Sequence, residues 1–405
     1  MPLSSATSTP SETPPTRPAA TGADETAAPP LWIPSPYLLL GGLLWAVLSA
    51  AAWQAPLCCS SGLQAAVIER LRADLLHPTF PMTDLPAMAS AHYSPYALVQ
   101  GLAARATGVS GRTVVAVAAS VNLLLLLTGI GRLTRLLTPN RWVPVGILAV
   151  PALIHWADPA RWSAPGTFAV AVTLHLWAWT GRAAGRAPAS ASGGPPRRTP
   201  RWTEVAGIGA LLGLVLLVHP PTAIGAVLGA VALIAVRQRT RIRPTLRRWA
   251  LTAACGLAVA ALWPYYNGLT APYSAEASGP VSRPKGGESP AVGEPYTWAT
   301  PYVPPGEVVL TDSRPAMYAL AGHGVYVLAD GLPDVGLAAA ERRARSRAVA
   351  DYLAPSARPE RREEIRARYG VRWLLLTRFQ RLPENATVLA FSPRTGEVLA
   401  RLPEL

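Results

Sequence analysis

The sequence predicts a polytopic α-helical membrane protein of about seven spans with a small extracytoplasmic α/β domain at its C-terminus. Its composition is the first reason: 50% of the 405 residues are hydrophobic and only 15% are charged, whereas a soluble domain carries about 25% charged residues. The second reason is distribution, because residues 31–267 are strongly apolar and residues 268–405 are ordinarily polar. The third is that arginines cluster on alternate connections between the apolar runs. A single soluble domain does not fit these patterns.

The N-terminal residues 1–30 contain seven prolines and no apolar periodicity, so we expect a disordered cytoplasmic segment. The first span is expected at 31–53, which carries no charge. Six further apolar runs lie at about 113–131, 142–157, 164–181, 204–218, 221–236 and 249–267. His219-Pro220-Pro221 separates two of them, and one continuous helix across both would be about 50 Å long. We therefore expect a hairpin that turns at the two prolines.

Arginine placement predicts the orientation. The connections 132–141, 182–201 and 237–248 together hold fourteen arginines, whereas the short connections that alternate with them hold only Arg161. Cytoplasmic loops carry the excess of arginine, so the sequence predicts a multi-pass plasma-membrane protein with a cytoplasmic N-terminus. The loop 54–112 and the C-terminal domain are then extracytoplasmic. These arginines are expected to contact membrane lipids, and no basic–aromatic pattern indicates nucleic-acid binding.

Two extramembrane regions are expected to be structured. In the long first outer loop, amphipathic helices are predicted at 64–76 and 96–107, with a proline-rich irregular stretch between them. After a proline-rich linker at 268–306, residues 307–405 alternate strand and helix patterns, which predicts a small parallel or mixed sheet. The expected elements are strands at 308–311, 325–328 and 371–377, helices at 314–321, 338–353 and 359–369, and a final hairpin turning at 393–396.

The outer face carries the residues that could act on a lipid-linked sugar. Such chemistry needs a carboxylate to accept a proton from the acceptor hydroxyl, and donors or cations to hold the leaving phosphate. Asp84 and Asp74 are the candidate carboxylates. Asp84 lies in a proline-bounded loop with no cation nearby in sequence, where a plain turn is an equal alternative. Asp74 has the spacing of an i,i+4 ion pair with Arg70, so Asp84 is preferred.

Further candidates are polar residues predicted on the same face, although several have simpler roles. Asp158 precedes a proline, as turn-initiating residues do, and His219 has the position of a helix-end histidine. No spacing indicates a metal site; the sequence indicates no cofactor and leaves a divalent metal open. The candidate substrate-binding residues are His77, His92, Tyr93, Asp158, Arg161 and His219.

Four stretches carry a resemblance to a known family: VVLTDSRPAMYALAGHGVYVLA (308–329), RYGVRWLLLTR (368–378), the HPTFP…YSPY loop (77–96) and LWPYYN (262–267). With the long first outer loop, they resemble the GT-C superfamily of integral-membrane glycosyltransferases, in particular its actinobacterial members. The resemblance implies transfer of a sugar from a polyprenyl-phosphate donor to a cell-envelope acceptor. It also implies a catalytic carboxylate in the first outer loop, here Asp84 or Asp74, with His77, His92 and Arg161 as phosphate partners.

Two alternatives stay open. Members of that superfamily often carry an acidic pair in the first outer loop, and residues 54–112 contain no adjacent pair of acids. A non-catalytic multispan envelope protein, whose outer domain binds a partner or glycan, is therefore the second hypothesis. A transporter is the third, and it is disfavoured because charges within the apolar runs are nearly absent. Convergence of the outer-loop acids on one cavity would favour the enzyme, and their dispersal would favour the second hypothesis.

Overall fold

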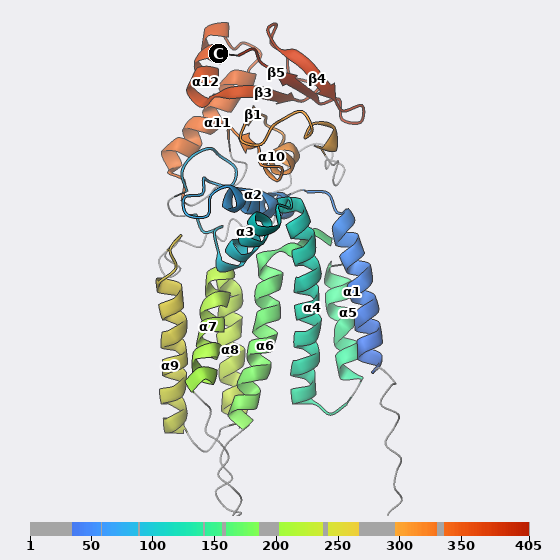
Figure 1. The fold of residues 1–405 in the computed structure, drawn as a ribbon, viewed down its shortest axis with the longest axis vertical. Coiled ribbons are helices and arrows are strands. Elements are labelled where there is room, and N and C mark those ends of the chain that lie inside the picture. Colours follow the sequence, from blue (N-terminus) through green and yellow to red (C-terminus); the bar gives the residue numbers. More distant parts are fainter. Residues whose placement is uncertain are drawn as a thin grey trace, which may run out of the picture. The chain divides into compact units, whose positions relative to one another are not determined.

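The structure is a computed structural model that describes residues 35–57, 59–87, 90–140, 142–155, 159–185, 202–237, 242–266, 296–329 and 336–404. The expected disordered segment 1–30 and most of the proline-rich linker lie outside these residues. The described chain is mostly helical with one small sheet (Figure 1). Its N-terminal part contains α1 (Pro36–Gln54), α2 (Cys59–Ala73), α3 (Pro95–Thr107), α4 (Gly111–Leu137), α5 (Val143–His155), η1 (Pro159–Ser163), α6 (Pro165–Gly185), α7 (Trp202–Val218), α8 (Pro220–Arg237) and α9 (Ile242–Ala261).

The prediction of about seven spans is wrong for the described residues. Among the helices of the described residues, only α1 and α4 are both long and apolar enough to cross a membrane. The apolar stretches of α7, α8 and α9 are too short, since 17 residues of helix extend about 25 Å against a hydrocarbon core of about 30 Å. The helix α6 has 21 residues, but its histidine and arginine lower its hydropathy. The two long apolar helices support a membrane association by length and composition.

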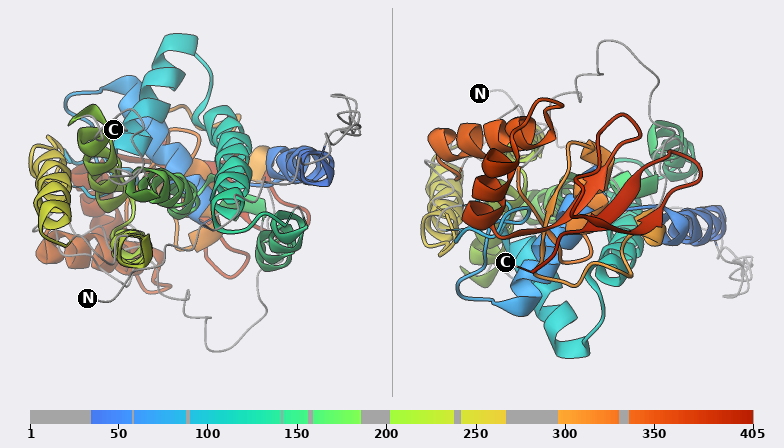
Figure 2. Two further views of the ribbon diagram at one scale, coloured as in Figure 1. Left: turned by 90° about the horizontal axis from the view of Figure 1, so that it is seen from below. Right: turned by 90° about the horizontal axis from the view of Figure 1, so that it is seen from above.

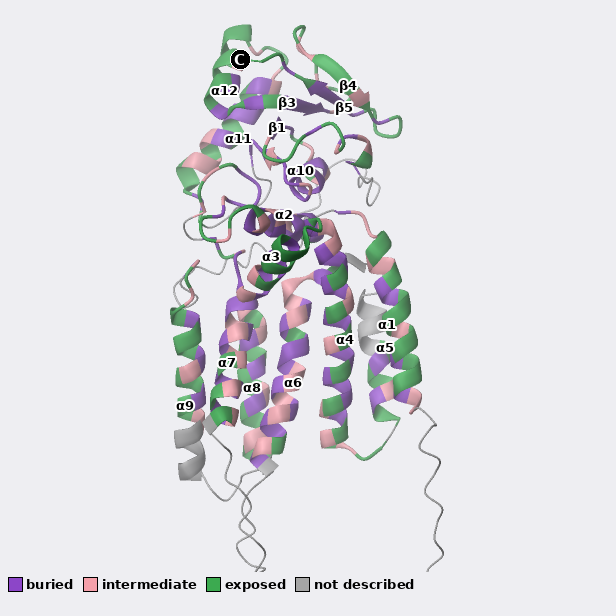
Figure 3. Cartoon of the chain, in the orientation of Figure 1, coloured by how far each residue is buried: buried purple, intermediate pink, exposed green. Residues whose placement is uncertain are grey.

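The helices α1 and α4 to α9 run side by side, and their packing follows sequence order only in part (Figures 1 and 2). The helix α4 packs against α1 and α6, α6 packs against α8, and α7 packs against α9. Gly209 allows α7 to pack closely against α9, because a Cβ at this position would lie 2.6 Å from the Thr252 carbonyl oxygen of α9. The chain breaks at His219 between α7 and α8, as the hairpin prediction requires. Many residues of α1 are exposed (Figure 3), and they include the apolar Leu38, Leu39 and Leu43.

The helices α2 and α3 lie across the ends of α4 and α6 (Figure 1). Ser94 caps α3 by accepting a hydrogen bond from the Ala97 amide, and Pro95 occupies the first turn. The apolar face of α2 is fully buried at Ile68 and Leu71, because α3 and α4 cover one side and the C-terminal region covers the other. Gly62 permits this second contact, since a Cβ there would lie 2.6 Å from the Tyr318 carbonyl oxygen.

The C-terminal region forms a mixed five-stranded sheet in the order β2-β1-β3-β5-β4. The pairs β1–β2 and β1–β3 are parallel, and β3–β5 and β4–β5 are antiparallel. Alternate residues of β1 and β3 point to opposite faces, so Leu310 and Leu374 pack with α11 and α12, whereas Val309 and Trp373 pack with α10. The elements are η3 (Tyr296–Trp298), β1 (Val308–Leu310), α10 (Arg314–Ala321), β2 (Tyr326–Val327), α11 (Ala339–Leu353), α12 (Pro359–Tyr369), β3 (Val371–Leu376), β4 (Thr387–Phe391) and β5 (Val398–Arg401).

Candidate functional site

Asp74 lies just beyond the C-terminal end of α2, where the chain turns out of the helix. Its Oδ1 accepts hydrogen bonds from the backbone amides of Leu76 at 2.9 Å and His77 at 3.0 Å. These two bonds hold the pKa of the Asp74 carboxyl below its usual value. The carboxylate is solvent-exposed, and among the described residues no basic side chain forms an ion pair with it. It is therefore an ionised, oriented and accessible oxygen acceptor.

Residues 263–265, which follow α9, pack beside the turn that contains Asp74. The indole of Trp263 donates to the Tyr93 carbonyl oxygen at 2.9 Å, and the Tyr265 hydroxyl donates to the Leu75 carbonyl oxygen. The rings of Tyr93 and Tyr265 lie 6.0 Å apart. Burial, together with the negative charge of Asp74, raises the pKa of the Tyr265 hydroxyl. Asp74, His77, Tyr93 and Tyr265 therefore gather where the first loop meets the end of α9, and we call these four residues the α2-end cluster.

Asp84 lies at the tip of a short hairpin-like loop, residues 78–87. The Phe80 amide donates to the Leu85 carbonyl oxygen at 2.7 Å, which closes the turn around Asp84. The Asp84 carboxylate forms an ion pair with Arg345 of α11 at 2.9 Å, and the Arg345 side chain is only 5% exposed. Arg345 also binds Glu341 at 2.9 Å. The charge of Asp84 is thus compensated by a cation that the sequence places 261 residues away.

Arg70 does not pair with Asp74, contrary to the i,i+4 expectation. Its two terminal nitrogens donate to the carbonyl oxygens of Gly324 and Val325, each at 2.8 Å, and its Nε donates to that of Pro81 at 3.3 Å. The guanidinium lies 3.6 Å from the ring centroid of Tyr326, and burial lowers its pKa. Arg70 therefore joins α2 to the turn before β2, and Asp74 is left without the ionic partner predicted for it.

The other predicted binding residues that the structure describes lie on different elements or make different contacts. His92 is half-buried, and its amide lies 3.4 Å from the Ser90 hydroxyl. Arg161 is an exposed residue of η1, which packs against α4. His219 lies between α7 and α8, with its Nδ1 2.7 Å from the Thr222 hydroxyl oxygen. Asp158 lies outside the described residues. His77 and Tyr93 thus lie with Asp74 in the α2-end cluster, whereas Arg161 and His219 lie on other elements of the described chain.

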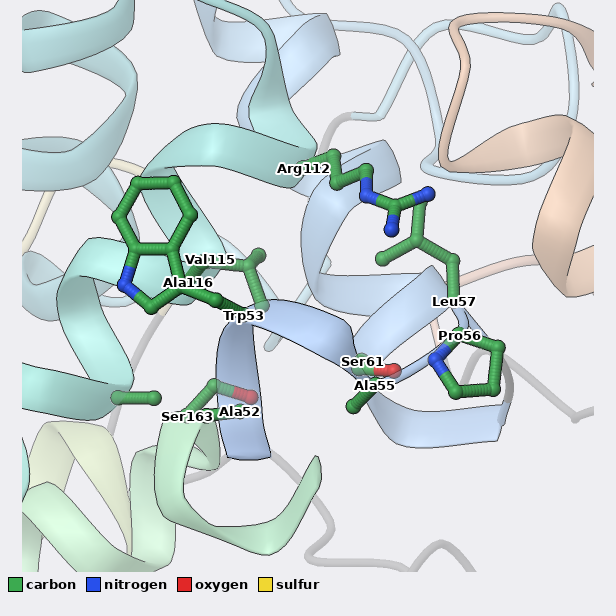
Figure 4. Close-up of a pocket in the computed structure, with 11 residues that line it drawn as sticks. Ala52, Trp53, Ala55, Pro56, Leu57, Ser61, Arg112, Val115, Ala116 and Ser163 are labelled. Atoms are coloured by element: carbon green, nitrogen blue, oxygen red, sulfur yellow. The ribbon is translucent and has the colours of Figure 1, made fainter. Parts of the chain in front are cut away.

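A small pocket lies between the end of α1, α2, α4 and η1, and none of the predicted acids lines it (Figure 4). Its volume is about 20 Å³, enough for about one water. Trp53 and Leu57 supply apolar walls, and Arg112 and Ser61 supply polar ones. Glu69, another acid of the first loop, caps α4, since its Oε1 accepts from the Gly111 amide at 2.5 Å. The pocket was not predicted, because its walls come from four separate segments.

No group of three or more potential metal ligands occurs in the part of the chain that the structure describes. The sequence also gave no sign of Tyr265 and Arg345 as neighbours of the candidate acids. The aromatic run 263–266 is evident in the sequence, but its contacts with Leu75 and Tyr93 are not, because they join segments far apart in the chain. Arg345 is one of many arginines on α11, and only its burial distinguishes it.

Comparison of the chain with protein-family models, curated proteins and solved structures gives no match. The GT-C resemblance therefore rests on the residues quoted above.

Proposed function

We propose that this protein is a membrane glycosyltransferase that moves a sugar from a polyprenyl-phosphate donor to a cell-envelope acceptor, with Asp74 as the proton acceptor. One observation carries the proposal: Asp74 is exposed, is oriented by two backbone amides, and has no ionic partner among the described residues. A general base must be ionised and accessible to the acceptor hydroxyl. Asp84 meets this requirement less well, because Arg345 already holds one of its oxygens.

The remaining polar groups of the α2-end cluster are His77, Tyr265 and Tyr93, whose hydroxyl donates to the Thr79 carbonyl oxygen. His77 is exposed and directly follows the turn that holds Asp74, so in this proposal it donates to the leaving phosphate. Tyr265 fixes the turn by its bond to the Leu75 carbonyl oxygen. Its role is to position Asp74, and its hydroxyl is already engaged.

The orientation we propose has a cytoplasmic N-terminus before α1 and an extracytoplasmic first loop between α1 and α4, and the C-terminal domain lies on the same side as this loop because α10 packs against α2. The fourteen arginines on three connections support this orientation. Cysteine labelling of intact cells tests it. A cysteine at Ser356 on the C-terminal domain should react with a membrane-impermeant reagent, whereas one at Ser192 should not. The reverse result would exclude this orientation.

The test of glycosyl transfer is an assay of membranes with a panel of polyprenyl-phosphate sugars. Transfer should occur with one donor class, and Asp74→Asn should lower its rate by about 10²–10⁴-fold, as loss of a general base does. Ser60→Ala, an exposed change on α2, is the control and should retain full transfer. Wild-type transfer by Asp74→Asn would remove Asp74 from the mechanism.

A second candidate function is a non-catalytic envelope protein whose C-terminal domain binds a partner or glycan. The dispersal of Asp74, Asp84 and Glu69 over separate structural roles favours it. In that case no donor is consumed, and Asp74→Asn leaves every function of the protein unchanged.

A further inference from the structure

The helix α3 presents a row of apolar side chains outward. Val99 is 67% exposed and Leu102 is 46% exposed, and Ala103 and Ala106 continue the row at helical spacing. The opposite face is already used, because Tyr96, Gln100 and Ala104 are buried against α2 and α4. The described chain therefore leaves much of this outward row uncovered.

The position of α3 relates this row to the long apolar helix α4. Only Gly108, Val109 and Ser110 separate the two helices, and α3 lies beside the first turns of α4 (Figure 1). The outer face of α4 is itself apolar, with Val117, Val121 and Leu124 between 46% and 49% exposed. In the view from below, α3 projects sideways beyond α4 (Figure 2). The exposed apolar surface thus continues from a candidate span onto a helix at its end.

The charge of α3 indicates which kind of surface would contact its exposed apolar row. The sequence of α3 contains no acidic residue, and its one charged side chain, Arg105, is exposed in the last turn. An apolar row flanked by arginine is typical of helices that lie in the boundary between lipid headgroups and acyl chains. A protein partner would not require continuity with a candidate span.

We propose that α3 is embedded in the bilayer interface, with Val99 and Leu102 among the upper acyl chains and Arg105 at anionic headgroups. The sequence at 64–76 is amphipathic as well, but the apolar face of α2 is buried, so α3 takes this role among the described helices of the first loop. The proposal is independent of glycosyl transfer, since it concerns the surface and not the α2-end cluster.

Fluorescence quenching in vesicles tests this placement with the full chain. Cys58, Cys59 and Cys255 are replaced by serine, and one environment-sensitive dye is attached after Leu102→Cys, Val99→Cys or, as the matched exposed control on α12, Ala367→Cys. Dyes at 102 and 99 should be quenched by a nitroxide near the carbonyl end of the acyl chain more than by one near its methyl end. The dye at 367 should be quenched only by aqueous iodide.

Two results would overturn the proposal. Iodide quenching at 102 as strong as at 367 would mean that α3 faces water. Protection at 102 from both lipid nitroxide and iodide would mean that a protein surface or a second copy covers it. The charge requirement has its own measurement: quenching at 102 should be stronger with phosphatidylglycerol in the vesicles than with phosphatidylcholine alone, and Arg105→Gln should abolish that difference. An equal signal in both vesicles would refute the anionic-headgroup contact.

Discussion

The two aspartates of the first loop differ in what surrounds them, although they lie ten positions apart in the sequence. Asp74 is held by its own neighbours, through the amides of Leu76 and His77. Asp84 is held by Arg345, which belongs to a helix in a different part of the fold. A carboxylate fixed by backbone amides keeps its charge uncompensated, whereas an ion pair with a buried arginine compensates the charge of the carboxylate. Asp84 therefore joins the loop to the C-terminal region, and this difference is the reason that Asp74 is the base in the proposed function.

The largest effect is expected on the rate of glycosyl transfer, which should differ between the variants of the two aspartates. Asp74→Asn should reduce glycosyl transfer by about 10²–10⁴-fold, while Asp84→Asn should retain transfer within about tenfold, because its amide can still accept a hydrogen bond from Arg345. Initial rates with the preferred donor measure both. If Asp84→Asn is the inactive variant and Asp74→Asn is active, the assignment of roles is reversed.

The next largest effect concerns the attachment itself. Arg70→Met removes three donors from buried carbonyl groups and the stacking on Tyr326. Unsatisfied buried acceptors cost about 1–3 kcal/mol each, so the free energy of unfolding should fall by about 3 kcal/mol. Denaturant unfolding of the purified protein in detergent, followed by tyrosine and tryptophan fluorescence, measures this. Arg72→Met is the control, since Arg72 is half-exposed and makes only a 3.4 Å contact with Glu69.

A smaller effect is expected for the ion pair of Asp84. Arg345 is buried but the Asp84 side chain is 40% exposed, so solvent screens the pair and the loss should be about 1 kcal/mol. A double-mutant cycle of Asp84→Asn and Arg345→Met gives the coupling energy. A coupling of zero would show that the pair does not attach the loop.

The smallest effect is the pH dependence from Asp74. Its pKa is lowered in the folded state, so its contribution to stability is fully present above the unfolded value of about 3.9 and is lost as the pH falls through the folded pKa. The stability difference between wild type and Asp74→Asn should stay constant from neutral pH to about pH 5 and shrink in more acidic buffer. A difference that grows on acidification would mean that the pKa is raised.

Local signals in the sequence were sufficient to place several elements. The helix expected at 314–321 is α10, and the helix expected at 359–369 is α12, because a proline near the start and a glycine after the end mark their limits. The order of strands could not be derived, since β5 lies between β3 and β4. The span count was wrong because charge-free runs such as 142–157 form helices too short to cross a bilayer unaided.

The candidate site could be predicted only where its contacts are local. Asp74 and His77 are adjacent through a turn, which sequence spacing allows. The partners that decide the roles, Arg345 for Asp84 and Tyr265 for the Asp74 turn, are separated from them by many elements. In the sequence, Asp74 is a suitable ion-pair partner for Arg70, because it lies four residues later. Arg70 instead binds the carbonyl oxygens of Gly324 and Val325, since α2 packs against that turn.

The two edges of the C-terminal sheet are finished differently. At β2 the Val327 amide donates to the Met82 carbonyl oxygen at 2.8 Å, so the first loop supplies the pairing that an edge strand lacks. At β4 the described chain adds no strand, and Val388 and Phe391 are exposed. During synthesis the loop emerges from the ribosome more than 200 residues before the strand it covers. A C-terminal fragment released from the loop would have two uncovered edges instead of one, and open edges promote strand-to-strand association. Proteolysis between the two regions would therefore turn a membrane-attached domain into one prone to self-association.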